Sequence, residues 1–147
     1  MKTVFETRFA RVGETATHYQ QTKINSTEAA KAWALESLGS YFAERLDQEE
    51  FLIATLDTKL QVRRVVRITR GTLDASLVHP REVFRPAIAD CASAILCVHN
   101  HPSGDPTPSR QDHEVTTRLK QVGELIGITV IDHIVVGEGK AVSLAEL

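Results

Sequence analysis

The sequence has little of what defines a secreted, membrane-spanning or cysteine-rich protein. Its 147 residues include 2 cysteines, Cys91 and Cys97, whose number and spacing suit neither a disulfide framework nor a four-cysteine zinc site. No apolar run approaches the roughly 20 residues that cross a bilayer. The first residues, MKTVFETRFARVGETATHYQQ, contain no apolar segment followed by a small-residue cleavage site. We therefore expect a cytoplasmic protein that does not associate with membranes.

A strong charge of one sign is also lacking, as are repeats and linkers. The 17 Lys and Arg residues nearly balance 19 Asp and Glu residues, so the net charge of -2 argues neither for nor against an acidic partner. With 42% hydrophobic and 24% charged residues, the composition is that of a globular protein that buries its own core. We expect residues 1–25 to form an N-terminal arm and residues 26–147 to form one domain.

Helical and strand patterns alternate along that domain. Apolar residues recur at helical spacing in three segments, and short apolar runs bounded by turn residues indicate strands between them. The predicted helices cover residues 25–46, 79–94 (interrupted by Pro86) and 109–127, and the predicted strands cover 49–57, 60–69, 94–99, 128–137 and 141–144. Because the central strands are apolar on both faces, the pattern indicates an α/β (α+β) fold with a mixed sheet flanked by helices.

The stretch VHNHPSGDPTPSRQDH carries the most specific chemistry in the sequence. His99 and His101 stand at the end of a predicted strand, where side chains two residues apart share one face. Pro102 keeps His101 extended, and Asp112 falls in the first turn of the following helix, where a carboxylate is favoured. Two imidazoles and a carboxylate, with a fourth position left for water, form the ligand set of catalytic zinc.

Structural interpretations compete with this one. Ser109 and Asp112 also form a capping box, in which each side chain bonds the other residue's amide at a helix start. Asp105 is near enough to serve as a ligand, although its neighbours are turn residues. Cys97 shares the strand face of His99 and is assigned to packing. His133 is interpreted as a structural histidine, with support of the site as the alternative.

The spacing H-x-H, seven residues, S, two residues, D is the JAMM motif of the JAB/MPN metalloprotease superfamily. The segments EEFLIATLD, GTLDASLVHPREVFRPAI, HNHPSGDPTPSRQD and IDHIVVGEGKAVSL resemble the RadC-like branch of that superfamily. The resemblance implies a cytidine-deaminase-like fold. It also implies one zinc ion per chain held by His99, His101 and Asp112, with Ser109 supporting an oxyanion. Larger RadC-like proteins carry an N-terminal helix-hairpin-helix region, so this chain resembles the short, single-domain form.

The catalytic glutamate of the family must lie upstream, and the residues alone leave three candidates. Glu82 opens a helix, where an acidic residue is expected for dipole reasons. Glu49 and Glu50 open a strand and point to opposite faces, but apolar residues occupy both faces, so periodicity does not choose between them. The family pattern places its glutamate two positions before Phe51, and the resemblance therefore implies Glu49.

These features predict a zinc-dependent metallohydrolase that cleaves an amide bond in a protein or peptide. The first alternative is a nuclease or DNA-binding module of DNA-repair type, with weak contact through Arg63, Arg64 and Arg67 in the basic segment KLQVRRVVRITR. A literal HNH string does not make an HNH nuclease, and the H-x-E and P-C-x-x-C signatures of zinc deaminases are absent. The second alternative is a metal-binding interaction domain without activity.

Overall fold

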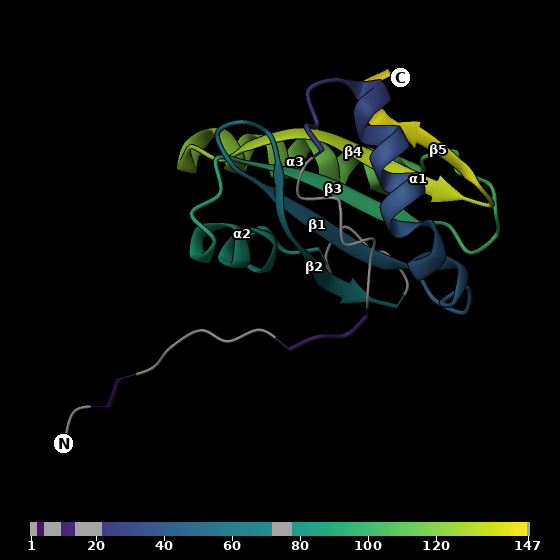
Figure 1. The fold of residues 1–147 in the computed structure, drawn as a ribbon, viewed down its shortest axis with the longest axis horizontal. Helices are drawn as coiled ribbons and strands as arrows, with labels where there is room; N and C mark the ends of the chain where they lie inside the picture. The colour runs from purple at the N-terminus through teal and green to yellow at the C-terminus, as the bar shows by residue number, and fades with distance from the viewer. Residues whose placement is uncertain (1–2, 5–9, 14–21, 72–77, 147) are drawn as a thin grey trace.

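The computed structural model describes residues 3–4, 10–13, 22–71 and 78–146. Five strands in these residues form one sheet in the order β2-β1-β3-β4-β5. Strands β3 and β4 are parallel and the other neighbours are antiparallel, which confirms the predicted mixed sheet (Figure 1). The strands are β1 (Glu50–Leu56), β2 (Val62–Arg70), β3 (Ala94–Asn100), β4 (Thr129–Gly137) and β5 (Lys140–Ser143).

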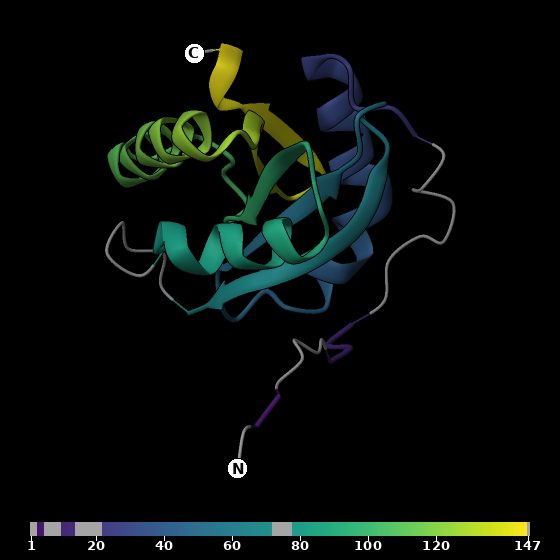
Figure 2. The same ribbon diagram turned by 90° about the vertical axis from the view of Figure 1, so that its left-hand side faces the viewer.

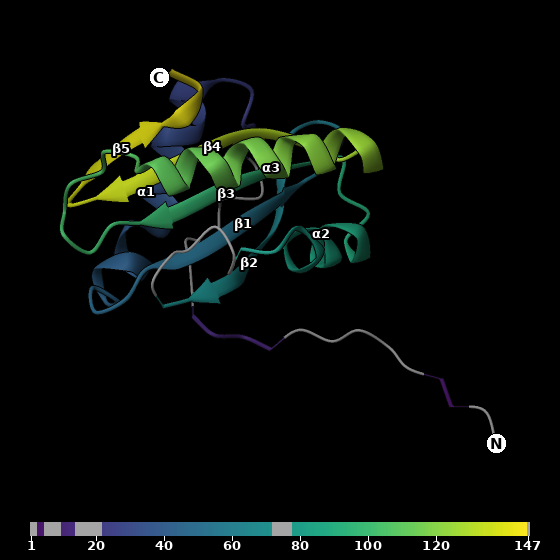
Figure 3. The same ribbon diagram turned by 180° about the vertical axis from the view of Figure 1, so that it is seen from behind.

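Helices cover both faces of the sheet. Figure 2 shows α1 on one side and α2 and α3 together on the other, and Figure 3 shows α3 crossing in front of β3 and β4. The helices are α1 (Thr27–Ala43), α2 (Pro80–Ala89) and α3 (Arg110–Ile126). Ser26 caps α1 by accepting the Ala29 N–H at 3.1 Å, as its position before the apolar pattern indicates.

The central strands separate two apolar cores. Leu52 and Ala54 of β1 pack toward α1, whereas Phe51 and Ile53 pack toward α2 and α3. The same alternation runs through β3, where Cys97 lies on the α3 side. Two-sided burial explains why these strands consist almost entirely of apolar residues, and it gives every position in β1 and β3 a defined face.

The second helix is shorter than predicted and is not interrupted at Pro86. α2 ends at Ala89, its capping residue Asp90 donates its N–H to the Pro86 carbonyl, and Cys91 turns with a φ of 52°. Pro86 removes one main-chain donor, but its ring is buried among the helix residues that face the sheet. The predicted helix therefore extended too far, into the turn that leads to β3.

Only part of the predicted N-terminal arm lies among the described residues. Lys23 forms an isolated antiparallel bridge with Gln61, and the Ile24 N–H donates to the Leu60 carbonyl at 2.8 Å. The Ile24 side chain is buried in the core beneath α1. The end of the arm thus packs on the domain, whereas residues 1–2, 5–9 and 14–21 lie outside the described residues.

Candidate metal centre

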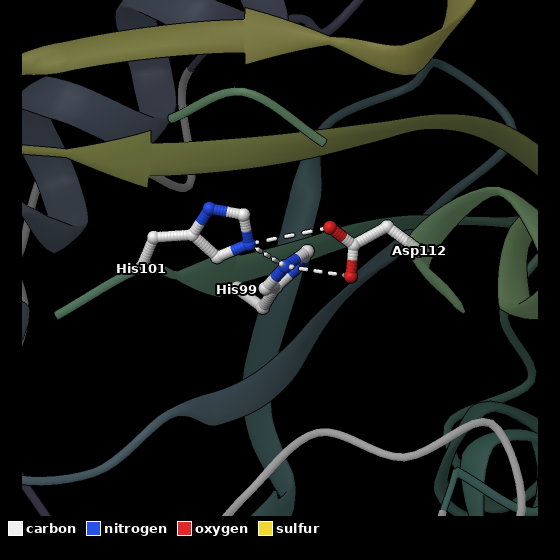
Figure 4. Close-up of side chains that lie close together, drawn as sticks. All are labelled: His99, His101 and Asp112. Carbon is white, nitrogen blue, oxygen red and sulfur yellow. Dashed lines mark hydrogen bonds and ion pairs between the residues drawn. The ribbon is translucent and has the colours of Figure 1, made fainter. Parts of the chain in front are cut away.

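The structure brings His99, His101 and Asp112 together, as the motif spacing predicts. The two histidines leave the end of β3 and the aspartate leaves the first turn of α3, and their side chains converge (Figure 4). His99 Nε2 lies 3.0 Å from His101 Nε2 and 3.2 Å from Asp112 Oδ1. His101 Nε2 lies 3.2 Å from Asp112 Oδ2. We call these three side chains the His–His–Asp group.

The His–His–Asp group fits a small tetrahedral metal ion. Zinc bound to nitrogen and oxygen at about 2.0–2.1 Å has ligand atoms about 3.3–3.4 Å apart. Here the two Nε2 atoms are 3.0 Å apart, and each lies 3.2 Å from a different oxygen of Asp112. Burial opposes ionisation of Asp112, but its contacts with the His101 and His99 rings, together with the hydrogen bond from the Ser109 N–H, outweigh burial and hold the pKa of the carboxyl well below its ordinary value. An ionised, almost fully buried carboxylate beside two imidazoles can bind a metal ion.

Ser109 forms the capping box that the sequence predicts, and its role as oxyanion helper stays a prediction. Its Oγ accepts the Asp112 N–H at 3.2 Å, and its own N–H donates to Asp112 Oδ2 at 2.7 Å, which completes the capping box. The cap uses a lone pair of the hydroxyl oxygen and leaves the hydroxyl hydrogen available. Ser109 is exposed, so this hydrogen can point toward a bound molecule while the cap holds Asp112 in place.

His101 is oriented by the loop that follows it. Its Nδ1 lies 2.9 Å from the Asp105 carbonyl oxygen. A carbonyl only accepts hydrogen bonds, so Nδ1 carries the proton and donates, which leaves the Nε2 lone pair of a neutral ring facing the His–His–Asp group. The Asp105 carboxylate instead accepts from Thr107, so among the candidate ligands Asp105 contributes its main chain and not its side chain.

Two glycines let this loop approach the sheet closely. A Cβ at Gly137 would lie 2.6 Å from the Gly104 carbonyl oxygen, closer than such atoms come in proteins. The His101 N–H also donates to the Val136 carbonyl at 2.8 Å, so the loop is fastened to the end of β4. The position of His101 therefore depends on residues more than 30 positions downstream.

His99 is enclosed by other buried side chains. Its ring stacks on Phe51 with centroids 6.2 Å apart, and its Nδ1 lies 2.7 Å from His133 Nε2. His133 Nδ1 in turn lies 2.6 Å from Thr116 Oγ1. His133 therefore contacts a candidate ligand directly, which favours the alternative interpretation of this residue over a purely structural one.

The two adjacent glutamates at the start of β1 have different surroundings. The Glu50 carboxylate is buried on the α1 side, where Arg67 Nη1 donates to it at 3.0 Å. The pKa of the nearby Tyr41 hydroxyl is raised, first by burial of the hydroxyl and then by the negative charge of Glu50. Glu49 has the opposite parity, shared with Phe51 and His99, and is half-buried. Burial lowers the pKa of His101, but contacts with Asp112 and Asp105 raise it overall, and the negative charge of Glu49 adds to that rise. These surroundings support Glu49 as the proposed base.

Asn100, between the two histidines, fixes the main chain on either side of Glu49. Its Oδ1 accepts the Glu50 N–H at 2.7 Å, and its Nδ2 donates to the Gln48 carbonyl at 3.2 Å. The residue is 3% exposed, so water does not compete strongly for these bonds. One side chain of β3 thus joins the strand that carries the histidines to the segment that carries Glu49.

Asn100→Ala should lower the free energy of unfolding by about 1–3 kcal/mol, because the buried Glu50 N–H loses its acceptor. Urea denaturation measures this change, and hydrogen exchange at the Glu50 amide should become faster. Gln48→Ala is the matched control, since Gln48 is exposed and contributes only its carbonyl to the contact. Equal stability of Asn100→Ala and the control would show that the Asn100 contacts are energetically unimportant.

The arginines of β2 have partners within the protein. Arg64 forms an ion pair with Asp90, Arg63 Nη1 donates to the Asp90 carbonyl at 2.8 Å, and Arg67 pairs with Glu50. Arg63 and Arg67 lie at odd positions of the strand and Arg64 at an even one, so the charge is divided between faces. These contacts account for the basic segment without a nucleic acid.

Among the described residues, Cys97 has the packing role expected of it, and two further histidines lie outside the candidate metal centre. His113 is exposed, and Cys97 is buried in the core, where burial raises the pKa of its thiol to about 12. The second of these histidines, His79, was not singled out in the sequence, yet its Nδ1 accepts the Arg81 N–H at 3.1 Å and caps α2. Its place immediately before Pro80 is the signal that could have predicted this cap.

Three residues around the candidate metal centre have a larger part in it than the sequence predicted. Asn100 and Thr116 were not singled out, and His133 was interpreted as structural. For the two side chains on strands a signal exists: Asn100 and His133 are polar residues within apolar runs, and buried polar groups need partners. Thr116 lies four residues after Asp112 on α3, a spacing that places both on one side of the helix.

Comparison with known proteins agrees with the class that this fold and this group of side chains define. The family model described as "RadC-like JAB domain" matches residues 24–147, and the chain belongs to that family. A "UPF0758 protein" of Clostridium perfringens is 44% identical over 126 residues, which cover 86% of this chain and 53% of the relative. "UPF0758 protein" sequences of Trichlorobacter lovleyi and Syntrophotalea carbinolica are 52% and 49% identical over 67% and 76% of this chain.

The chain spans about half the length of the curated relatives it matches, with 43% and 50% of the two latter relatives covered. The printed names of these relatives state no activity, substrate or metal. The short, single-domain form therefore stays a prediction. Among the described residues, no helix is both long and apolar enough to cross a membrane.

Proposed function

We propose that this domain is a zinc-dependent hydrolase of amide or isopeptide bonds in a protein or peptide. The observation that carries the proposal is the convergence of two imidazole nitrogens and a buried carboxylate, 3.0–3.2 Å apart, beside the exposed Ser109 hydroxyl. Bound zinc would supply a Lewis acid that polarises the carbonyl and lowers the pKa of water from 15.7 to about 7.

The residues of the chain have separate tasks in this proposal. His99, His101 and Asp112 hold the ion, and the capping box keeps Asp112 still. Glu49 accepts a proton from the attacking water and then delivers it to the leaving amine. The Ser109 hydroxyl donates a hydrogen bond to the carbonyl oxygen as negative charge develops on it.

Zinc analysis followed by a substrate screen tests this function. The purified protein should contain about one zinc ion per chain, and it should cleave peptide or isopeptide substrates in a reaction that a chelator abolishes and added zinc restores. A protein that binds no zinc at micromolar concentration would contradict the proposal at its first step. Zinc binding without hydrolysis across the screen would favour the inactive metal-binding domain.

DNA binding is the second candidate, and the basic strand β2 is the observation that favours it. The contacts of Arg64 with Asp90 and of Arg67 with Glu50 already neutralise much of this charge. The part of the chain that the structure describes also contains one group of three candidate ligands, whereas phosphodiester cleavage commonly uses two metal ions about 4 Å apart. We therefore propose that any DNA affinity of this domain is electrostatic and separate from the metal centre.

The double variant Arg63→Gln and Arg64→Gln should weaken DNA binding and reduce its salt dependence, because fewer counterions are released. Zinc content should not change. The matched control is Arg81→Gln with Arg85→Gln, which removes the same charge from exposed side chains of α2. Binding isotherms at several salt concentrations provide the measurement. Chelator-sensitive DNA cleavage that disappears in Glu49→Gln would instead place the nuclease function first.

A further inference from the structure

A line of buried hydrogen bonds runs behind His99, on the side away from the other two ligands. His99 Nδ1 contacts His133 Nε2 at 2.7 Å, and His133 Nδ1 contacts Thr116 Oγ1 at 2.6 Å. Thr116 Oγ1 donates to the main-chain carbonyl of Asp112 at 2.9 Å. The side chains come from β3, β4 and α3, and we call them the Thr116–His133 bridge. His99 is 0% exposed, His133 1% and Thr116 7%.

The carbonyl at the end of this bridge determines the direction of the two hydrogen bonds nearest to it. Asp112 O has no hydrogen to give, so at 2.9 Å the Thr116 hydroxyl must donate to it. That hydroxyl has one hydrogen and therefore accepts at its contact with His133. Since an acceptor needs a donor opposite, His133 Nδ1 carries a proton.

The same reasoning extends to His99. A charged His133 would be costly in this position, because the ring is buried and neither of its nitrogens contacts a carboxylate. In a neutral ring with the proton on Nδ1, Nε2 accepts, and the hydrogen at the 2.7 Å contact must come from His99 Nδ1. We infer that Thr116 and His133 are positioning residues that hold His99 in the tautomer whose Nε2 lone pair faces the metal position.

The bridge explains how the His–His–Asp group is prepared for a cation, and this inference rests on the proposed metal site. His101 is held in the same tautomer by the Asp105 carbonyl. Two nitrogen lone pairs and a carboxylate then lie within 3.2 Å of one another. These electron-rich atoms repel one another, and a bound cation would remove that repulsion. The bridge also ends on the peptide group of Asp112, so one set of hydrogen bonds orients ligands from both β3 and α3.

A pair of substitutions at Thr116 tests the bridge. Thr116→Val keeps the shape of the side chain and removes the hydroxyl, so His133 Nδ1 loses its acceptor and the orientation of His99 is no longer enforced. We expect zinc affinity, measured by competition with a chelator, to fall about 10–100-fold, the usual effect of losing such a contact. Thr116→Ser restores the hydroxyl and should bind zinc within a few-fold of wild type. Urea denaturation of the metal-free forms separates this effect from lost stability.

Wild-type zinc affinity in a folded Thr116→Val variant would overturn the inference. A second measurement needs neither that variant nor a metal: nitrogen-15 chemical shifts of the imidazoles in the metal-free wild-type protein should show His133 protonated on Nδ1 and bare on Nε2. The opposite tautomer would also overturn it. Wild-type protein that binds no zinc but shows the expected His133 tautomer would contradict the proposed function and leave the hydrogen-bond direction established.

Discussion

Glu49→Gln is expected to leave zinc bound and to lower hydrolysis at least about 100-fold, the contribution of a well-placed general base. The amide has nearly the shape of the carboxylate but does not accept the proton of the attacking water. Zinc should stay because Glu49 is outside the His–His–Asp group. Zinc content and the single-turnover rate, on a peptide that the wild-type protein cleaves, provide the measurements.

Glu50→Gln is the matched control for that experiment, because it makes the same chemical change one residue further along. Glu50 is buried on the opposite face and pairs with Arg67 at 3.0 Å. Its substitution should reduce the free energy of unfolding by about 1–3 kcal/mol and leave the rate per folded molecule within a few-fold of wild type. If turnover is lost in Glu50→Gln and kept in Glu49→Gln, the assignment of the base is reversed.

The pattern of elements and the ligand spacing are local properties, and sequence predicted both. Strand alternation places His99 and His101 on one face, and the helix start after the proline-rich loop holds Asp112, all within 14 positions. Residues so near one another in the sequence come together once the local secondary structure forms. The end of α2 was harder to predict, because the turn at Cys91 interrupts no obvious apolar periodicity.

The choice between Glu49 and Glu50 was not a local property. Both faces of β1 are buried, so its residues carry no alternation of apolar and polar character that marks one side. The resemblance to the family selected Glu49, and the partners of Glu50 became visible only once β2 and α1 were placed beside it. For a strand buried on both faces, the sequence alone does not show which residues face which layer of helices.

The Thr116–His133 bridge and the ion pairs of β2 show the same limit more strongly. His133 is 34 residues from His99 in the sequence, and Arg64 is 26 residues from Asp90. Polar residues in apolar runs indicate that partners exist, but only the pairing of β3 with β4 identifies them. Tertiary contacts therefore engage arginines of a basic segment in internal ion pairs, and they place a histidine that was interpreted as structural against a candidate metal ligand.

His99→Ala and Asp112→Ala are each expected to remove zinc from the protein, since two protein ligands do not retain a catalytic zinc ion at ordinary affinity. Hydrolysis should disappear with the metal. Asp112 also completes the capping box of α3 and is 1% exposed, so Asp112→Asn is the better variant for separating charge from cap. It keeps an oxygen that accepts the Ser109 N–H and removes the negative charge that strengthens the bond of this ligand to zinc.

His113→Ala is the control that distinguishes ligation from the loss of any histidine in this region. His113 follows Asp112 in the same helical turn but is exposed and takes no part in the His–His–Asp group, so this variant should keep about one zinc ion per chain. Circular dichroism should show all four variants folded. Zinc retained in both His99→Ala and Asp112→Ala would disprove the ligand assignment and, with it, the proposed hydrolase, whereas zinc lost only from His113→Ala would place the metal on the outer side of α3.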